Sequence, residues 1–243
     1  MLFEMKKITR RLSIKVIRCI PAFIVVLFCF VSFSIDAQAQ LCAREDGNPQ
    51  IIFKSTLSTL EYVREDSSDE LSQKHSGMAV SDVLGLAGGN LDMTLSLEMS
   101  GVAQNRGKNL YCIQIKKVFA DFIANPVIYI ASNFARGSCE YNAVLKHEEL
   151  HIDILERAHD EGKGRARDAL YEIIRERSAL PYVSLGALDK QKNMIMHDIR
   201  AKLDVVMHEL QQDLFEKQRE IDTYQSYATI LSQCKGWEKK LNE

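Results

Sequence analysis

Five consecutive residues, His147-Glu148-Glu149-Leu150-His151, have the types and spacing to bind a metal ion and use it for hydrolysis. On a helix, residues four apart lie on the same face, so both imidazoles can reach one ion. Imidazole nitrogen suits Zn²⁺, and a glutamate after the first histidine can take a proton from a zinc-bound water that attacks a carbonyl. The motif therefore predicts a zinc site with His147 and His151 as ligands and Glu148 as general base.

The residues around this motif favour a buried, metal-binding position over a solvent-exposed one. Val144, Leu155 and Ala158 fall on the same helical stripe as the two histidines, so both imidazoles lie in an apolar face. A single histidine in such a face is usually a core residue, but two of them, four apart and with this glutamate, favour metal binding. The alternative is a binding or assembly module in which the motif helix is structural or vestigial.

A catalytic zinc also needs a third protein ligand and one open coordination position. One class of zinc peptidases takes a histidine six residues after the second motif histidine, but Arg157 stands there and excludes that class. Another class takes an acid from a later helix. If the chain turns between residues 178 and 190 and runs back as a second helix, Glu149 lies opposite Arg219, so the third ligand should lie near Arg219.

Three acids stand near that point of the second helix: Glu216, Glu220 and Asp222. We expect Glu220 to be the third ligand because it lies closest to the apolar stripe of that helix. If Gly162 or Gly164 breaks the first helix, the register shifts and other residues become candidates: Asp153, Asp204, His208 and Glu209. Three further residues could stabilise the negative charge that develops on the attacked carbonyl: His159, Tyr224 and Tyr227.

The elements that must position these residues follow from a change in hydrophobic period. Residues 40–135 are strand-rich, with apolar and polar side chains alternating from Leu91 to Met99 and a polar, loop-like stretch at 66–77. Further strands are indicated at 51–63, 111–122 and 126–131. Residues 136–243 form a helical metal-binding part, with apolar residues every three or four from 140 to 179 and from 188 to 237.

These patterns predict an α+β fold, in which a small antiparallel sheet precedes a long antiparallel helical hairpin that carries HExxH. The short apolar strand at Val127 to Ala131 comes just before the motif helix. It could be an edge strand that pairs with an extended peptide, or simply the last strand of the sheet.

The first 39 residues have the order of a secretory signal peptide. Six basic residues between Lys6 and Arg18 precede an apolar run from Ile20 to Ile35, and Ala37-Gln38-Ala39 has the small residues of a cleavage site. The run of 16 residues is shorter than the roughly 20 that span a bilayer. We therefore expect a secreted or periplasmic protein with no stable membrane association after cleavage.

Without this leader the chain keeps 25 basic and 31 acidic residues, and such an acidic balance gives no electrostatic reason to expect nucleic-acid binding. Four cysteines remain: Cys42, Cys112, Cys139 and Cys234. An even number in an oxidising compartment predicts two disulfides. Of the three possible pairings we favour Cys42–Cys234, which would tie the termini, with Cys112–Cys139.

The stretch from Tyr141 to Asp153, YNAVLKHEELHID, resembles a bacterial family of secreted zinc-dependent proteases with a zincin-like HExxH motif. His147, Glu148, His151 and Asp153 match its first motif, and 220–224 and 233–237 loosely match its acidic-aromatic second segment. The resemblance covers about the last hundred residues. It implies an exported zinc-dependent metallopeptidase that acts on peptide or protein substrates, although a zinc hydrolase of cell-wall amides would use the same residues.

Overall fold

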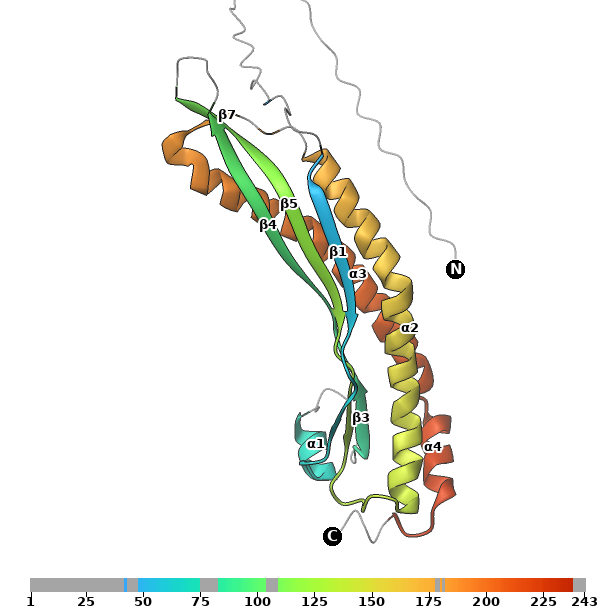
Figure 1. Ribbon diagram of the computed structural model, residues 1–243. Coiled ribbons are helices and arrows are strands. Elements are labelled where there is room, and N and C mark those ends of the chain that lie inside the picture. The colour runs from blue at the N-terminus through green and yellow to red at the C-terminus, as the bar shows by residue number, and fades with distance from the viewer. Residues whose placement is uncertain are drawn as a thin grey trace, which may run out of the picture. The chain divides into compact units, whose positions relative to one another are not determined.

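The computed structural model describes residues 42, 48–74, 83–103, 109–177, 180 and 182–237 (Figure 1). The proposed signal peptide lies outside the described residues. Ala39 to Glu243 form one compact unit, so the change from strands to helices near residue 135 does not separate two bodies. The α+β class is confirmed, with mixed sheets and two long helices.

The larger sheet is built around β5 (Leu110–Ala124). β4 (Leu91–Ala103) and β7 (Tyr182–Ser184) pair with it antiparallel, whereas β1 (Gln50–Leu57) pairs with it parallel. The prediction of an antiparallel sheet is therefore wrong for β1. Two parallel strands need a long connection between them. The chain between β1 and β5 is long enough, because it includes β4 of the same sheet.

The chain segments that form β1, β4 and β5 extend past a bend, and their extensions form the smaller sheet. β2 (Glu61–Val63) is parallel to β6 (Val127–Ile130), and β3 (Gly85–Gly88) is antiparallel to it, in the order β2-β6-β3. An edge position was one of the two possibilities considered for β6, but β6 is central and β3 is an edge strand. Gly89 allows the bend, because its φ is +154° and a Cβ there would overlap the carbonyl oxygen of Asn125.

A short helix, α1 (Ser68–Lys74), stands where the polar composition predicted a loop. Its start is a reciprocal cap: the Glu70 carboxylate accepts from Ser67 N at 2.7 Å, and the Ser67 hydroxyl accepts from Glu70 N at 3.3 Å. Leu71, only 1% exposed, anchors the helix in the core around the small sheet. The Ser-x-x-Glu spacing was the signal that the sequence analysis missed.

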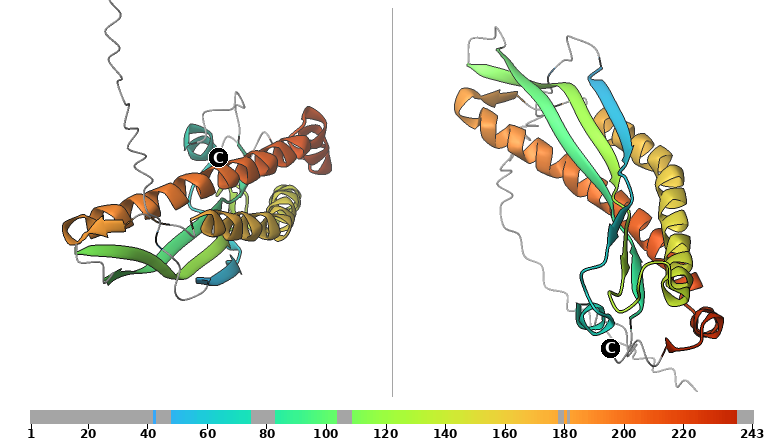
Figure 2. Two further views of the ribbon diagram at one scale, coloured as in Figure 1. Left: turned by 90° about the horizontal axis from the view of Figure 1, so that it is seen from above. Right: turned by 60° about the horizontal axis from the view of Figure 1, so that its bottom comes forward.

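Two long antiparallel helices, α2 (Cys139–Glu176) and α3 (Leu188–Ile221), cover one face of the larger sheet (Figure 2). Arg177 pairs with Asp198 near the turn, at 2.7 Å, and Arg165 pairs with Asp213 further along, at 2.6 Å. Gly162 and Gly164 lie inside α2 and do not interrupt it.

The helical pattern of the second half of the hairpin was expected to form one helix, but the structure has two helices there. α3 ends at Ile221 and α4 (Tyr224–Gln233) begins after Thr223. The Thr223 hydroxyl accepts from Ser226 N, and the Ser226 hydroxyl accepts from Thr223 N. This reciprocal cap satisfies the backbone N–H groups of these two residues at the start of α4. Asp222 is left at the junction with non-helical backbone angles.

The disulfides join Cys42 to Cys112 and Cys139 to Cys234, so the favoured pairing is wrong. The hairpin explains the second bond: α3 runs back along α2, and α4 then brings Cys234 to the N-terminal end of α2, where Cys139 lies. Cys42 lies beside the other end, where its backbone N–H donates to Leu180 O at 2.9 Å. In the described part of the chain, no helix carries an apolar stretch long enough to cross a membrane.

Candidate metal centre

The N-terminal part of α2 buries three ionisable side chains side by side. His147, Glu148 and His151 are 7%, 5% and 5% exposed, and they share the buried face of the helix with apolar neighbours such as Val144 and Leu155. Ser138 begins the helix by accepting a hydrogen bond from Tyr141 N at 3.1 Å. Buried polar groups need partners, and the two histidines obtain theirs from outside α2.

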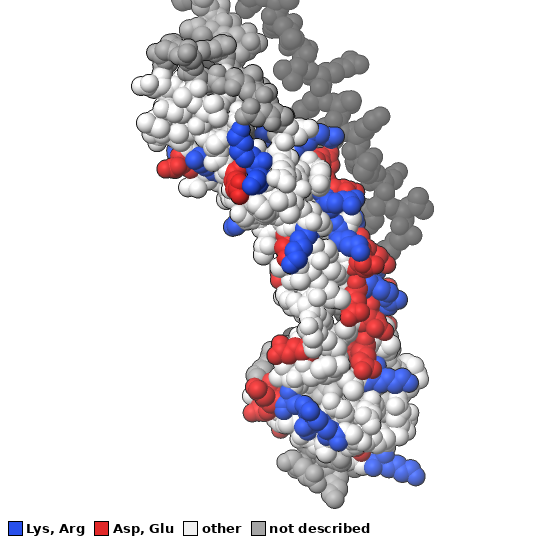
Figure 3. Space-filling model, in the orientation of Figure 1, with Lys and Arg blue, Asp and Glu red and all other residues white. Residues whose placement is uncertain are grey.

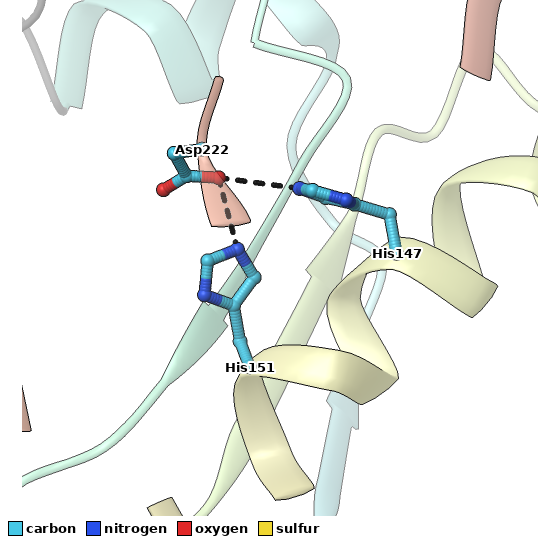
Figure 4. Close-up of side chains that lie close together, drawn as sticks. All are labelled: His147, His151 and Asp222. Atoms are coloured by element: carbon cyan, nitrogen blue, oxygen red, sulfur yellow. Dashed lines mark hydrogen bonds and ion pairs between the residues drawn. The ribbon is translucent and has the colours of Figure 1, made fainter. Parts of the chain in front are cut away.

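Asp222 supplies the contact that brings the two histidines together (Figure 4). Its Oδ1 atom lies 3.2 Å from His147 Nε2 and 3.0 Å from His151 Nε2. The three ligand atoms lie within 4.8 Å of one another, so His147, His151 and Asp222 could hold one metal ion. Two imidazole nitrogens and one carboxylate oxygen form a donor set that suits zinc, and three protein ligands leave a coordination position open.

The acid that lies beside the two histidines is Asp222 and not the expected Glu220. Glu220 is an exposed residue of α3 and does not belong to the group. A helix turns by about 100° per residue, so positions 220 and 222 flank opposite sides of the apolar stripe at Leu214 and Ile221. The stripe alone does not reveal which flank faces the histidines. In addition, α3 ends at Ile221, and the chain turn there directs the Asp222 carboxylate toward them.

The register of the hairpin was close to the prediction. Glu149 was predicted to lie opposite Arg219. In the structure, Gln218, next to Arg219, contacts His151, which is two residues after Glu149. The remaining candidates are exposed and lie outside the group: Glu216, Asp153, Asp204, His208 and Glu209. Asp153 is an exposed residue of α2. Acidic side chains gather along one side of the surface (Figure 3).

Of the three residues proposed to stabilise an oxyanion, only Tyr227 lies at this site. Its hydroxyl donates to Asp222 Oδ1 at 3.4 Å, and its ring centroid is 5.6 Å from that of His147. Burial, together with the negative charges of Asp222 and Glu148, raises the pKa of Tyr227 to about 12. Tyr224 is 90% exposed, and His159 stacks on Phe122 at a centroid distance of 5.0 Å.

Glu148 lies against β3, beside the two histidines. Burial raises its pKa, the charges of His147 and His151 lower it, and the Asp222 charge raises it, so that the net pKa is about 7 instead of the usual 4.5. Gly85 makes room for this carboxylate, because a Cβ on Gly85 would lie 2.9 Å from Glu148 Oε1 and 2.6 Å from Val144 Cγ1. The site therefore depends on a glycine in β3.

The ligand residues polarise one another. Burial raises the pKa of Asp222, but hydrogen bonds from His147 and His151 outweigh it, and the net pKa lies well below the usual range. Burial lowers the pKa of His151, yet hydrogen bonds to Asp222 and Gln218 raise it above its usual value. The group thus presents an ionised carboxylate to two imidazoles, and a bound cation would replace the proton shared between them.

Comparisons with protein-family models, curated proteins and solved structures found no match. The site combines an HExxH helix, an acid from the junction between α3 and α4, and a buried glutamate beside them.

Proposed function

We propose that the protein is a zinc-dependent hydrolase, and more specifically an exported metallopeptidase. The observation that carries this proposal is the convergence of His147 Nε2, His151 Nε2 and Asp222 Oδ1 on one point, beside the buried Glu148. Zinc bound there would polarise a scissile carbonyl and acidify the attacking water. The two contacts of Asp222 Oδ1 with the histidines also fit a structural role as hydrogen bonds, and metal analysis distinguishes the two roles.

The chain supplies a proton acceptor and a proton donor around the ligand group. Glu148 follows His147 on α2 and is placed to take the proton of the attacking water and to pass it to the leaving amine. Tyr227 keeps its proton at neutral pH, since its pKa is about 12. Its hydroxyl donates to Asp222 in the structure, and it would have to exchange this partner to donate a hydrogen bond to the oxygen on which negative charge develops.

The small sheet supports a peptide as the substrate. β3 pairs with β6 on one edge, and among the described strands none pairs with its other edge. The same strand lies against α2 at Gly85 and Glu148. An extended peptide added to this edge would have its backbone fixed beside the general base. The two disulfides are compatible with the oxidising compartment that an exported protein enters.

Hydrolysis of a general peptide substrate, measured together with zinc content, tests the roles of motif residues. Glu148→Gln should retain zinc and lose activity by about 100-fold or more, because the general base is removed and the ligands remain. His151→Ala should lose both. Glu149→Gln, a neighbouring exposed glutamate of the same helix, is the matched control and should retain both. Wild-type rates in Glu148→Gln would remove the general-base assignment.

A further inference from the structure

Gln218 is a polar residue of the candidate metal centre to which neither the motif nor the proposed mechanism assigns a role. It lies on α3 four residues before Asp222, and is partly buried. Both of its side-chain contacts are with His151: Nε2 donates to the backbone oxygen of His151 at 3.0 Å, and Oε1 contacts Nδ1 of the imidazole ring. A single amide thus holds one ligand residue at two points.

The first contact determines the chemistry of the second. A backbone carbonyl only accepts hydrogen bonds, so the amide group must direct its NH₂ toward His151 O. The amide oxygen then faces His151 Nδ1, and because an amide oxygen also only accepts, Nδ1 must carry a proton. Without a metal, Nε2 lies 3.0 Å from the acceptor Asp222 Oδ1 and donates to it. A metal ion that replaces this proton leaves one N–H on the ring, at Nδ1, and a lone pair on Nε2.

We infer that Gln218 is a positioning residue, which holds His151 as the Nδ1–H tautomer with the Nε2 lone pair directed toward the ion. The inference rests on the proposed metal site. His147 is oriented by different contacts, since its ring packs edge-on against the His151 ring at a centroid distance of 5.1 Å and against Tyr227. The two ligands are thus held by different means, and only His151 depends on an amide.

A neutral acceptor suits the charge balance of the site. Asp222 and an ionised Glu148 carry two negative charges, which a divalent cation balances. Gln218 adds an acceptor for the N–H of His151 without adding a third negative charge. Partners of this kind fix the tautomer and orientation of metal-binding histidines, and losing one typically weakens metal binding by about 10- to 100-fold.

Three variants separate the acceptor from the rest of the side chain. Gln218→Met keeps the length and removes both polar contacts, whereas Gln218→Glu keeps an acceptor for Nδ1–H and removes the donor to His151 O. Gln212→Met, at an exposed position of the same helix, is the control. Glutamine, glutamate and methionine have similar helix propensities, so α3 itself should be little affected.

Two measurements on the full chain test the inference: the zinc dissociation constant from chelator competition, and the His151 tautomer from ¹⁵N NMR of the imidazole, with and without zinc. Gln218→Met should weaken zinc binding by about 10- to 100-fold and lose the Nδ1–H tautomer. Gln218→Glu should keep that tautomer, and Gln212→Met should match the wild type. An unchanged tautomer in Gln218→Met, or its loss in Gln218→Glu as well, would overturn the inference. If the wild type binds no zinc, the proposed function fails and the inference fails with it, whereas zinc binding with an unchanged tautomer in Gln218→Met overturns the inference alone.

Discussion

The two halves of α2 share one amphipathic pattern but bury different chemistry. The N-terminal half buries five ionisable side chains among its apolar ones: Glu140, His147, Glu148, His151 and His159. The half that follows Gly162 buries apolar side chains against the larger sheet and α3: Ala166, Leu170, Ile173 and Ile174. Buried polar groups contribute less to stability than apolar ones, so the second half stabilises a helix whose first half is committed to a site.

The largest effect on stability should come from the apolar half. Leu170 is fully buried, and Leu170→Ala should lower the free energy of unfolding by about 2–5 kcal/mol through lost transfer energy and a cavity. The fraction that remains folded should bind zinc with unchanged affinity, since Leu170 is far along the helix from His151. Denaturant unfolding and zinc titration check both expectations, and a parallel loss of zinc affinity would show that the two halves are not separable.

The pH dependence of stability should report the polar half. The folded state keeps the Glu148 proton up to about pH 7, while an unfolded chain loses it near 4.5. Between these values the folded state binds more protons, so stability falls as pH rises. In chelator-treated protein, Glu148→Gln should therefore gain relative to the wild type between pH 4 and pH 8, by on the order of 3 kcal/mol. A stability difference that does not change with pH would contradict the burial of an ionisable Glu148.

Gly85→Ala should sharpen the contrast by disturbing the site from the sheet. The new methyl group would meet Val144 and the Glu148 carboxylate, which should lower stability by about 1–3 kcal/mol and displace Glu148. Zinc content should be retained and peptide hydrolysis reduced, because the ligands come from other elements. Normal hydrolysis in Gly85→Ala would show that Glu148 does not need its place against β3.

The smallest effect should be found at the glycines in the middle of α2. A Cβ at Gly164 meets no described atom within 4 Å, so Gly164→Ala should raise stability by about 0.5–1 kcal/mol through helix propensity. A Cβ at Gly162 would lie 3.3 Å from both Leu210 Cδ2 and Phe122 Cζ, so Gly162→Ala should gain less or lose stability. Equal gains at both positions, measured by thermal unfolding, would contradict this packing.

The sequence sufficed for the parts of the site that are local. The spacing of His147 and His151 on one helix determines that the rings share a face, and the alternation from Leu91 to Met99 determines the buried side of β4, although the strand continues to Ala103. The third ligand depends on where α3 ends, and that end is set by the cap between Thr223 and Ser226, a short-range signal within a long helical pattern. The disulfides and the parallel β1 strand depend on how distant segments pack, which hydrophobic period does not report.

The most direct test of the central claim is the zinc content of purified mature protein for three chains: wild type, Asp222→Ala and Glu220→Ala. Glu220 stands two positions from Asp222 and is exposed, so it is a matched control for the loss of a carboxylate at this end of α3. We predict about one zinc per chain in the wild type and in Glu220→Ala, and little in Asp222→Ala. Zinc retained in Asp222→Ala, or no zinc in the wild type, would contradict a metal centre made of His147, His151 and Asp222.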